Sequence, residues 1–394
     1  MSRRQRAFLV LGLVVLAFNL RPAAVSVGPV LGEIRAGLGM GSTTAGLLTT
    51  LPVLCFAGFG YAAPWCGRTF GVHRVMLASL VVTTVGLVLR AEAQSAVVFI
   101  SATLPALAGM ATANVLIPSL VKRHFPDHIG SMTALYTTAL AIGLTSASVL
   151  TVPLENATGS WRGGLTSWAG VSLVAAIPWI GLILHDIKPP AERLRTITTR
   201  ALTRSPLAWT MAFFFGVQSL QAYAVFGWLP QIFRDAGFSA ETAGLLLGVT
   251  TATSIPISLV LPGITARGRH QGRIIVGLCA AYVAGYTGLI LGAATLPWLW
   301  ALLIGVGTGI FPLVLTLIGL RTRTSEGTAA LSGFAQSIGY LIAGVGPFMM
   351  GALYGATGGW TVPLVVLLLL VIPQGVSGLM VARERYVEDE LGVA

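Results

Sequence analysis

Arg21 is the residue of this chain whose type and position point most directly to a chemical role. It lies inside an apolar stretch from Ala7 to Leu31, about fourteen positions after its start. At 1.5 Å per helical residue this is roughly 20 Å, too deep for the side chain to reach water. A charge at mid-bilayer costs about 2.5–3.5 kcal/mol, so the guanidinium needs a counter-charge. We expect its fork of donors to bind a small anion or carboxylate, and a structural arginine bonded to carbonyls near Pro22 is the alternative.

Other polar side chains lie within further apolar stretches. Gln221 is fourteen positions into the stretch 207–233, as Arg21 is in its own, and Gln218 shares its helix face. Amides at mid-membrane depth must bond to protein or water, which leaves two interpretations: hydrogen bonds between helices, or a polar pocket. We predict a substrate pocket formed by Arg21, Asn114, Tyr136, Thr137, Gln218, Gln221, Tyr223, Gln336 and Tyr340.

The neighbours of Arg21 have structural interpretations as well. Pro22 removes a backbone hydrogen bond, so a break there would free the carbonyl of Phe18 and open the first helix at mid-depth; a tolerated membrane proline is the alternative. Asn19, two positions before Arg21, is expected to contact another helix. In the eleventh apolar stretch, Gly339, Gly344 and Gly346 are expected to be packing and hinge positions, where small residues let helices approach closely.

Acidic and histidine side chains do not accompany Arg21 into the apolar stretches. All 13 acidic residues and all 5 histidines fall in loops or near helix ends. An intramembrane enzyme needs paired catalytic groups at depth, so the sequence excludes one. The usual proton-coupling carboxylate is missing too. The three cysteines lack the spacing of a metal site, and we expect no metal and no cofactor.

Membrane-spanning helices must carry these residues. Of 394 residues, 55% are hydrophobic and only 9% are charged, against about 25% charged in soluble domains. One crossing needs about twenty mostly apolar residues. The predicted spans are 7–31, 43–65, 74–91, 97–121, 129–153, 163–184, 207–233, 240–264, 274–294, 298–319, 328–354 and 361–382.

The positive charge follows the loops rather than forming a patch on a soluble surface. The net charge is +11, and nineteen of the 24 Lys and Arg residues lie on one side of the predicted helices. Four lie on the other side: Arg35, Arg90, Arg162 and Arg234. The asymmetry places both termini in the cytoplasm, predicts a protein of the cytoplasmic (inner) membrane, and excludes nucleic acid as a partner.

The two halves of the chain repeat each other. Residues 44–48 recur at 242–246, and Ala157-Thr-Gly-Ser-Trp161 recurs as Ala356-Thr-Gly-Gly-Trp360. Six spans per half give both halves the same orientation in the membrane. We predict an N-terminal six-helix bundle (1–184), a cytoplasmic linker (185–205) and a C-terminal six-helix bundle (206–394).

This arrangement resembles the major facilitator superfamily. The resemblance implies an all-α membrane protein with twelve transmembrane helices in two pseudo-symmetric six-helix bundles, and a substrate site near mid-bilayer between them. The superfamily's loop motif between the second and third spans is altered here: Cys66-Gly-Arg-Thr-Phe-Gly-Val-His-Arg74 has Arg68 where an aspartate is usual. We assign gating or loop roles to Pro22, Arg68, Gly71 and Arg74.

Several stretches resemble a narrower group, the cyanate permease and 2-nitroimidazole transporter family. They are Asn19-Leu-Arg-Pro-Ala23, Asn114 to Pro126, Gly216 to Tyr223, Trp228-Leu-Pro230, Ala335 to Tyr340 and Thr357-Gly-Gly-Trp360. The resemblance implies cyanate uptake or export of small nitro-aromatics. It does not identify the substrate.

Together these features predict a secondary transporter that moves a small anion or weak acid, with Arg21 as the central anion-binding group. The expected partners are an anionic small molecule and the lipid bilayer, and we expect a monomer. A multidrug exporter of the same superfamily, for neutral or anionic drugs, is the alternative. The lone positive charge argues against cationic cargo.

Overall fold

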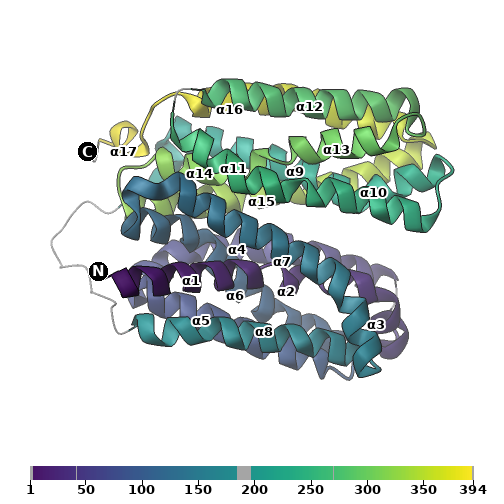
Figure 1. Ribbon diagram of the computed structural model, residues 1–394, viewed down its shortest axis with the longest axis horizontal. Helices are drawn as coiled ribbons and strands as arrows, with labels where there is room; N and C mark the ends of the chain where they lie inside the picture. The colour runs from purple at the N-terminus through teal and green to yellow at the C-terminus, as the bar shows by residue number, and fades with distance from the viewer. Residues whose placement is uncertain (1–2, 41, 184–196, 269, 393–394) are drawn as a thin grey trace. The chain divides into compact units, whose positions relative to one another are not determined.

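The computed structural model describes residues 3–40, 42–183, 197–268 and 270–392, which form helices joined by short connections and contain no strand (Figure 1). The helices of the first half are α1 (Arg3–Asn19), α2 (Pro22–Val25), η1 (Gly28–Val30), α3 (Leu31–Leu38), α4 (Ser42–Phe70), α5 (Val72–Ala91), α6 (Ala96–His124), η2 (Pro126–His128), α7 (Ile129–Thr158) and α8 (Trp161–Leu182). The second half has η4 (Ala201–Arg204), α9 (Pro206–Asp235), α10 (Ala240–Ala252), α11 (Ser254–Ala266), α12 (Gln271–Gly292), α13 (Pro297–Gly307), α14 (Ile310–Leu320), α15 (Ser325–Thr357), α16 (Thr361–Ala382) and α17 (Val387–Glu390).

The predicted spans correspond to these helices. Among the described residues that were searched, eleven helical segments are long and apolar enough to cross a bilayer. The remaining predicted span, 43–65, corresponds to α4, a helix of 29 residues. The chain is therefore an all-α membrane protein with the predicted series of spans.

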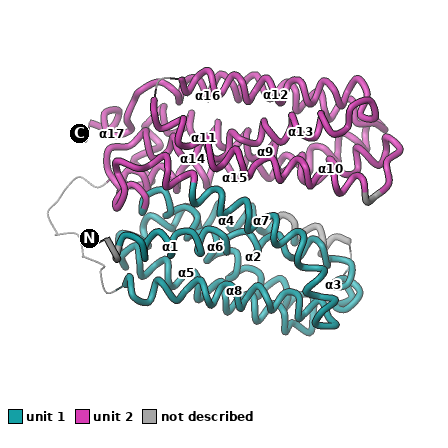
Figure 2. The backbone as a smooth tube through the Cα atoms, in the orientation of Figure 1, with its two compact units in different colours: residues 1–120, 135–196 teal, residues 121–134, 197–394 magenta. Residues whose placement is uncertain are grey.

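Two compact units make up the chain (Figure 2). Unit 1 comprises Met1–Leu120 and Leu135–Thr196, and unit 2 comprises Val121–Ala134 and Ile197–Ala394. The junction of α6 and α7 thus groups with the second unit. Most of the predicted linker, 185–205, lies outside the described residues, and its described end carries η4.

The sequence repeat gives two connections of matching local structure. α7 ends at Thr158 and α15 at Thr357, and each is followed by a glycine with positive φ, 73° at Gly159 and 69° at Gly358. The hydroxyl of Thr158 donates to the carbonyl of Leu154, and that of Thr357 to Leu353, both at 2.7 Å. A glycine is needed at each junction because L-residues with side chains rarely adopt positive φ.

Glycines bring α9 and α15 of unit 2 into close contact. A Cβ atom placed on Gly339 would lie 2.5 Å from the ring of Phe215 and 3.1 Å from the backbone nitrogen of Gly216. A Cβ atom on Gly346 would lie 2.6 Å from the carbonyl oxygen of Leu220. The packing role predicted for Gly339 and Gly346 is confirmed, as expected where small residues set the distance between membrane helices.

Two predicted spans of unit 2 are interrupted rather than continuous. Span 240–264 divides into α10 and α11 at Thr253, whose hydroxyl donates to the carbonyl of Val249 at 2.7 Å. Span 298–319 divides into α13 and α14, where the hydroxyl of Thr308 donates to Gly305 at 2.6 Å. Hydroxyls that compete for helix carbonyls bend membrane helices, and average hydrophobicity does not reveal this effect.

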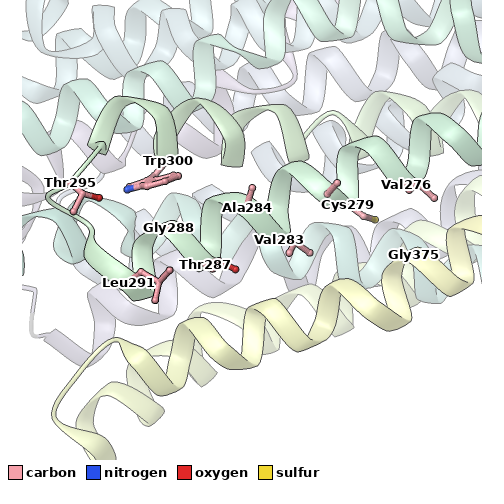
Figure 3. Close-up of a pocket in the computed structure, with 11 residues that line it drawn as sticks. Val276, Cys279, Val283, Ala284, Thr287, Gly288, Leu291, Thr295, Trp300 and Gly375 are labelled. Atoms are coloured by element: carbon pink, nitrogen blue, oxygen red, sulfur yellow. The ribbon is translucent and has the colours of Figure 1, made fainter.

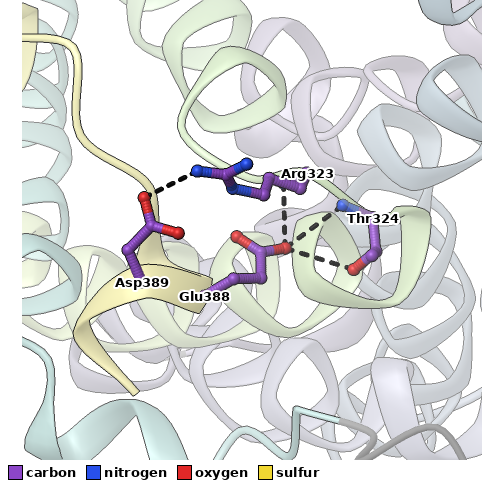
Figure 4. Close-up of polar contacts among 4 residues, drawn as sticks. All are labelled: Arg323, Thr324, Glu388 and Asp389. Atoms are coloured by element: carbon purple, nitrogen blue, oxygen red, sulfur yellow. Dashed lines mark hydrogen bonds and ion pairs between the residues drawn. The ribbon is translucent and has the colours of Figure 1, made fainter. Parts of the chain in front are cut away.

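The C-terminal segment of unit 2 caps two membrane helices. The carboxylate of Glu388 accepts hydrogen bonds from the backbone nitrogens of Arg323 and Thr324, at 2.9 and 3.1 Å, beside the first turn of α15 (Figure 4). Arg323 also pairs with Asp389 at 2.8 Å. Glu390 accepts from the hydroxyl of Ser205 and the backbone nitrogen of Leu207 at the start of α9. Carboxylates stabilise helix N-termini because the exposed N–H groups carry positive partial charge.

Replacement of Glu388 by Ala is expected to destabilise unit 2. Glu388 is buried, and each hydrogen bond to a charged group contributes about 1.5–3 kcal/mol. We expect a lower midpoint in thermal unfolding of the detergent-purified protein. Glu384→Ala is the matched control, because Glu384 is an exposed carboxylate of the same segment. Equal midpoints for the two variants would contradict the capping role.

Candidate substrate-binding site

The first membrane span is broken at Arg21. α1 ends at Asn19, residues 20 and 21 form a turn, and α2 begins at Pro22. Pro22 has no N–H to offer the carbonyl of Phe18, four residues earlier, so the helical hydrogen-bond series stops there. Of the two interpretations of Pro22, the structure has the break.

A glycine of α7 packs directly against this break. A Cβ atom placed on Gly143 would lie 2.0 Å from the carbonyl oxygen of Phe18 and 2.9 Å from its carbonyl carbon. Only a residue without a side chain allows this approach. The freed carbonyl therefore faces the backbone of α7 at short range rather than lipid, as buried polar backbone in a membrane requires.

Arg21 forms part of the turn between α1 and α2. Its side chain is half-buried and has an interaction partner in the structure. Its backbone carbonyl accepts hydrogen bonds from Ala24 and Val25 at 3.1 Å, which starts the next turn of helix. The guanidinium therefore extends from a point where the helix is interrupted, not from a regular helical surface.

Arg90 is a second buried guanidinium near the break, and it was missed from the sequence. It is 0% exposed, although its place near the end of span 74–91 indicated a loop cation. Its Nη1 donates to the carbonyl of Ala23 at 2.8 Å, and Nη2 donates to the hydroxyl of Ser26 at 3.2 Å. Arg90 thus connects α5 to the chain that follows Arg21. No local signal in the sequence distinguishes it from an interfacial arginine.

Asn19 lies on the other side of the break. Its side chain is 1% exposed, and within the described structure neither its amide nitrogen nor its amide oxygen has a hydrogen-bond partner. Asn19 is therefore buried, as a residue expected to contact another helix would be, but its amide makes no hydrogen bond within the described structure. A buried amide without hydrogen-bond partners lowers the stability of the folded protein, so Asn19 does not stabilise the fold through hydrogen bonds.

The other predicted site residues of unit 1 lie on α6 and α7. Asn114, Tyr136 and Thr137 are 4%, 2% and 2% exposed. Each has an interaction partner in the structure. Their burial agrees with either interpretation of the sequence, a pocket or contacts between helices.

The predicted residues of unit 2 lie on the two helices that the glycines bring together, α9 and α15. The ring of Tyr340 lies 5.2 Å from that of Phe215 and 6.4 Å from that of Tyr223, measured between centroids. Gln336, one turn before Tyr340, donates to the hydroxyl of Ser332 at 2.7 Å. Tyr223 and Tyr340 are thus brought together by packing of α9 on α15.

Gln221 makes its hydrogen bond to a residue that sequence reasoning overlooked. Its amide nitrogen donates to the amide oxygen of Gln374 on α16, and both side chains are fully buried. The remaining amide oxygen of Gln221 and amide nitrogen of Gln374 have no partner within the described structure. Gln218 accepts from the hydroxyl of Ser219 at 3.1 Å. Gln221 therefore links two helices, the first of its two interpretations.

The residues assigned to the loop motif lie at the junction of α4 and α5. Most of the motif is helical, because α4 continues to Phe70 and only Gly71 separates it from α5. Gly71 has φ of 90°, which favours glycine. Arg68 lies in the last turn of α4, and Arg74 is exposed in the first turn of α5.

An apolar groove of about 870 Å³ lies along α12 of unit 2 (Figure 3). Almost all of its lining surface is apolar, and its lining residues include Cys279, Thr287 and Trp300. Two of its lining residues, Val283 and Leu291, are 43% and 82% exposed, as expected for side chains that contact lipid. None of the predicted substrate-binding residues lines this groove.

No group of three or more His, Cys, Asp or Glu side chains that could hold a metal ion occurs among the described residues. The cysteines, Cys55, Cys66 and Cys279, are free thiols.

Comparison with known proteins identifies the family. The family model of the Major Facilitator Superfamily matches residues 7–347. A Bacillus subtilis (strain 168) protein, Uncharacterized transporter YycB, is 37% identical over 97% of this chain and 95% of its own length. The 2-nitroimidazole transporter of Escherichia coli (strain K12) is 33% identical over 98% of each chain. Cyanate transport protein CynX of the same organism is 29% identical, over 96% of this chain and 97% of its own.

A solved structure shares the fold. The proton:xylose symporter XylE bound to 6-bromo-6-deoxy-D-glucose has a TM-score of 0.76 with this chain at 14% identity. The match covers 98% of this chain and 97% of that chain. The predicted resemblance to cyanate and 2-nitroimidazole transporters is confirmed by the two named relatives. This chain therefore belongs to the Major Facilitator Superfamily and is a multi-pass membrane transporter of small molecules, not an enzyme.

Proposed function

We propose that this protein is a secondary transporter that moves a small anion or weak acid across the cytoplasmic membrane, with Arg21 binding the anionic group. The substrate is a cyanate-like or other small organic or inorganic anion, or a nitroimidazole-like compound. Transport proceeds by alternating access, in which the two six-helix halves, 1–184 and 206–394, rock and expose one substrate site to each side of the membrane in turn. The transporting unit is a monomer. Both termini lie in the cytoplasm.

The observation that carries this proposal is the placement of Arg21 at a break in a membrane helix. Transporters commonly bind substrate where a membrane helix is discontinuous, because unpaired backbone groups are tolerated there. Arg21 adds a permanent positive charge and paired donors to such a point. Asn19, two residues away, has an amide whose hydrogen-bonding capacity the described protein leaves unused.

The energy source follows from the charge of the cargo. Moving one negative charge inward against about 100 mV costs about 2.3 kcal/mol. The acidic residues and histidines of this chain fall in loops or near helix ends, so an intramembrane carboxylate is not the coupling device. Three routes remain: the proton travels on the weak acid itself, anions are exchanged, or flux runs downhill, which favours efflux of an anion.

Export of small aromatic compounds is the second candidate function. The relative that is named a 2-nitroimidazole transporter is 33% identical to this chain. In unit 2, the rings of Phe215, Tyr223 and Tyr340 form an aromatic cluster in which Tyr223 is partly exposed, and aromatic side chains are suited to contact a planar ligand. This function predicts binding that does not depend on the charge of the compound.

A thermal-shift screen separates the two functions. The purified protein is heated with cyanate, nitrate, acetate or benzoate, with the uncharged amides acetamide and benzamide, and with 2-nitroimidazole. We expect at least one anion to raise the unfolding midpoint, because a ligand at a hundred times its Kd stabilises by about 2.7 kcal/mol. Stabilisation by the uncharged compounds alone would contradict the anion site and favour the exporter.

A further inference from the structure

Arg90 has the partners of a residue that holds the broken span in place. Its two terminal nitrogens donate to the carbonyl of Ala23 and the hydroxyl of Ser26, two and five residues after Arg21. Ala23 lies in α2, a helix of only four residues, so its carbonyl is near a helix end where intrahelical donors run out. A carbonyl inside the membrane must be satisfied, and Arg90 supplies the donor from α5.

The charge of Arg90 is not balanced by its contacts. Within the described structure its neighbours are a carbonyl, a hydroxyl and the ring of Phe99, whose centroid lies 5.9 Å from the guanidinium carbon. Its Nε atom has no hydrogen-bond partner. A guanidinium does not lose its proton in a protein, and in a medium of low dielectric its field extends further than in water. A fully buried positive charge thus lies against the segment that carries Arg21.

We propose that Arg90 positions the segment 21–26 and supplies the second positive charge of the anion site. The positioning part stands on the two hydrogen bonds, whereas the electrostatic part rests on the proposed anion transport. This role does not require Arg90 to touch the substrate. The charge of Arg90 raises the electrostatic potential at the break, so it favours anionic over uncharged cargo. Its hydrogen bonds hold in place the segment from which the Arg21 side chain extends.

Two substitutions and a matched control separate charge from structure. Arg90→Lys keeps the charge, and Arg90→Gln keeps a donor without the charge. Arg162→Gln is the control: Arg162 is half-buried in the same unit and donates at 2.7 Å to the carbonyl of Ala91, next to Arg90 in the chain and not part of the segment 21–26.

Hydrogen–deuterium exchange tests positioning without any ligand. The amides of Leu20, Ala24, Val25 and Ser26 are hydrogen-bonded in the structure. We expect the peptide covering residues 20–27 to exchange at least tenfold faster in Arg90→Gln than in wild type, and unchanged in Arg162→Gln. Equal protection in Arg90→Gln and wild type overturns the positioning role.

Binding of benzoate, cyanate and the uncharged benzamide tests the charge. We expect Arg90→Gln to weaken the binding of the anions at least tenfold, to change benzamide less than threefold, and Arg90→Lys to recover most of the preference for anions. An equal loss for all three ligands would make Arg90 a structural residue only and overturn the electrostatic role. If wild type binds no anion, the proposed function and the electrostatic role both fail, and the exchange measurement alone decides the positioning role.

Discussion

Arg21→Ala protein that inserts normally is expected to lose saturable binding and transport of the anionic substrate. Removing one member of a buried, hydrogen-bonded charge pair costs about 2–5 kcal/mol, which corresponds to a loss of affinity from about thirtyfold to several thousandfold. The loss follows from the position of Arg21 at the interruption between α1 and α2. Binding is measured by the thermal shift with the anions of the screen, and transport by uptake into proteoliposomes.

Arg21→Lys is expected to lie between wild type and Arg21→Ala. Lysine keeps the charge but has no planar fork, so it cannot form two parallel hydrogen bonds to a carboxylate. Arg35→Ala is the control, because Arg35 is an exposed arginine of α3, in the same apolar helical segment Arg6–Leu38 but beyond the predicted span 7–31. Wild-type transport by correctly inserted Arg21→Ala would show that Arg21 is structural and would remove the anion site.

Gly143→Ala is expected to damage both stability and transport. The added methyl group would lie 2.0 Å from the carbonyl oxygen of Phe18 and 3.1 Å from its Cα atom, and these backbone atoms cannot move without displacing α1. Overpacking of this kind costs about 1–3 kcal/mol in cores, and here the displaced carbonyl belongs to the break beside Arg21. The measurements are the unfolding midpoint and transport at saturating substrate.

Gly170→Ala is the matched control for this substitution. Gly170 lies on α8 of the same unit, and a Cβ atom there would have no neighbour within 4 Å. Alanine is the better helix former, so Gly170→Ala should leave the midpoint unchanged or raise it slightly. If the two variants unfold at the same temperature and transport equally, α7 does not depend on close contact with the broken helix.

The membrane spans were predictable because each depends on local sequence. A helix in lipid satisfies its backbone within its own segment, so a stretch of about twenty apolar residues is sufficient to identify it. The interruptions at Thr253 and Thr308 were not predictable in the same way. Each lies at a threonine whose hydroxyl bonds to a carbonyl about one turn back, and such residues are also common in continuous membrane helices.

The candidate site was predictable only in part. Arg21 stood out because charge is rare in an apolar stretch, and Pro22 indicated the break beside it. Gln221 and Tyr340 were selected by their depth, their polar side chains and their place in the repeat, which do not separate a pocket from a contact between helices. The structure shows that Gln221 bonds to Gln374, a residue with an equally polar side chain in the last span that depth and repeat symmetry did not select.

The amino-acid sequence by itself determined the class of protein, the series of membrane helices, the internal repeat and the one charge that lies deep in a span. These properties depend on composition and on spacing within one segment. Only the tertiary structure decided what surrounds the break: that Gly143 meets the carbonyl of Phe18, and that Arg90 holds Ala23 and Ser26. Those contacts join residues more than sixty positions apart, and they exist because particular helices pack side by side.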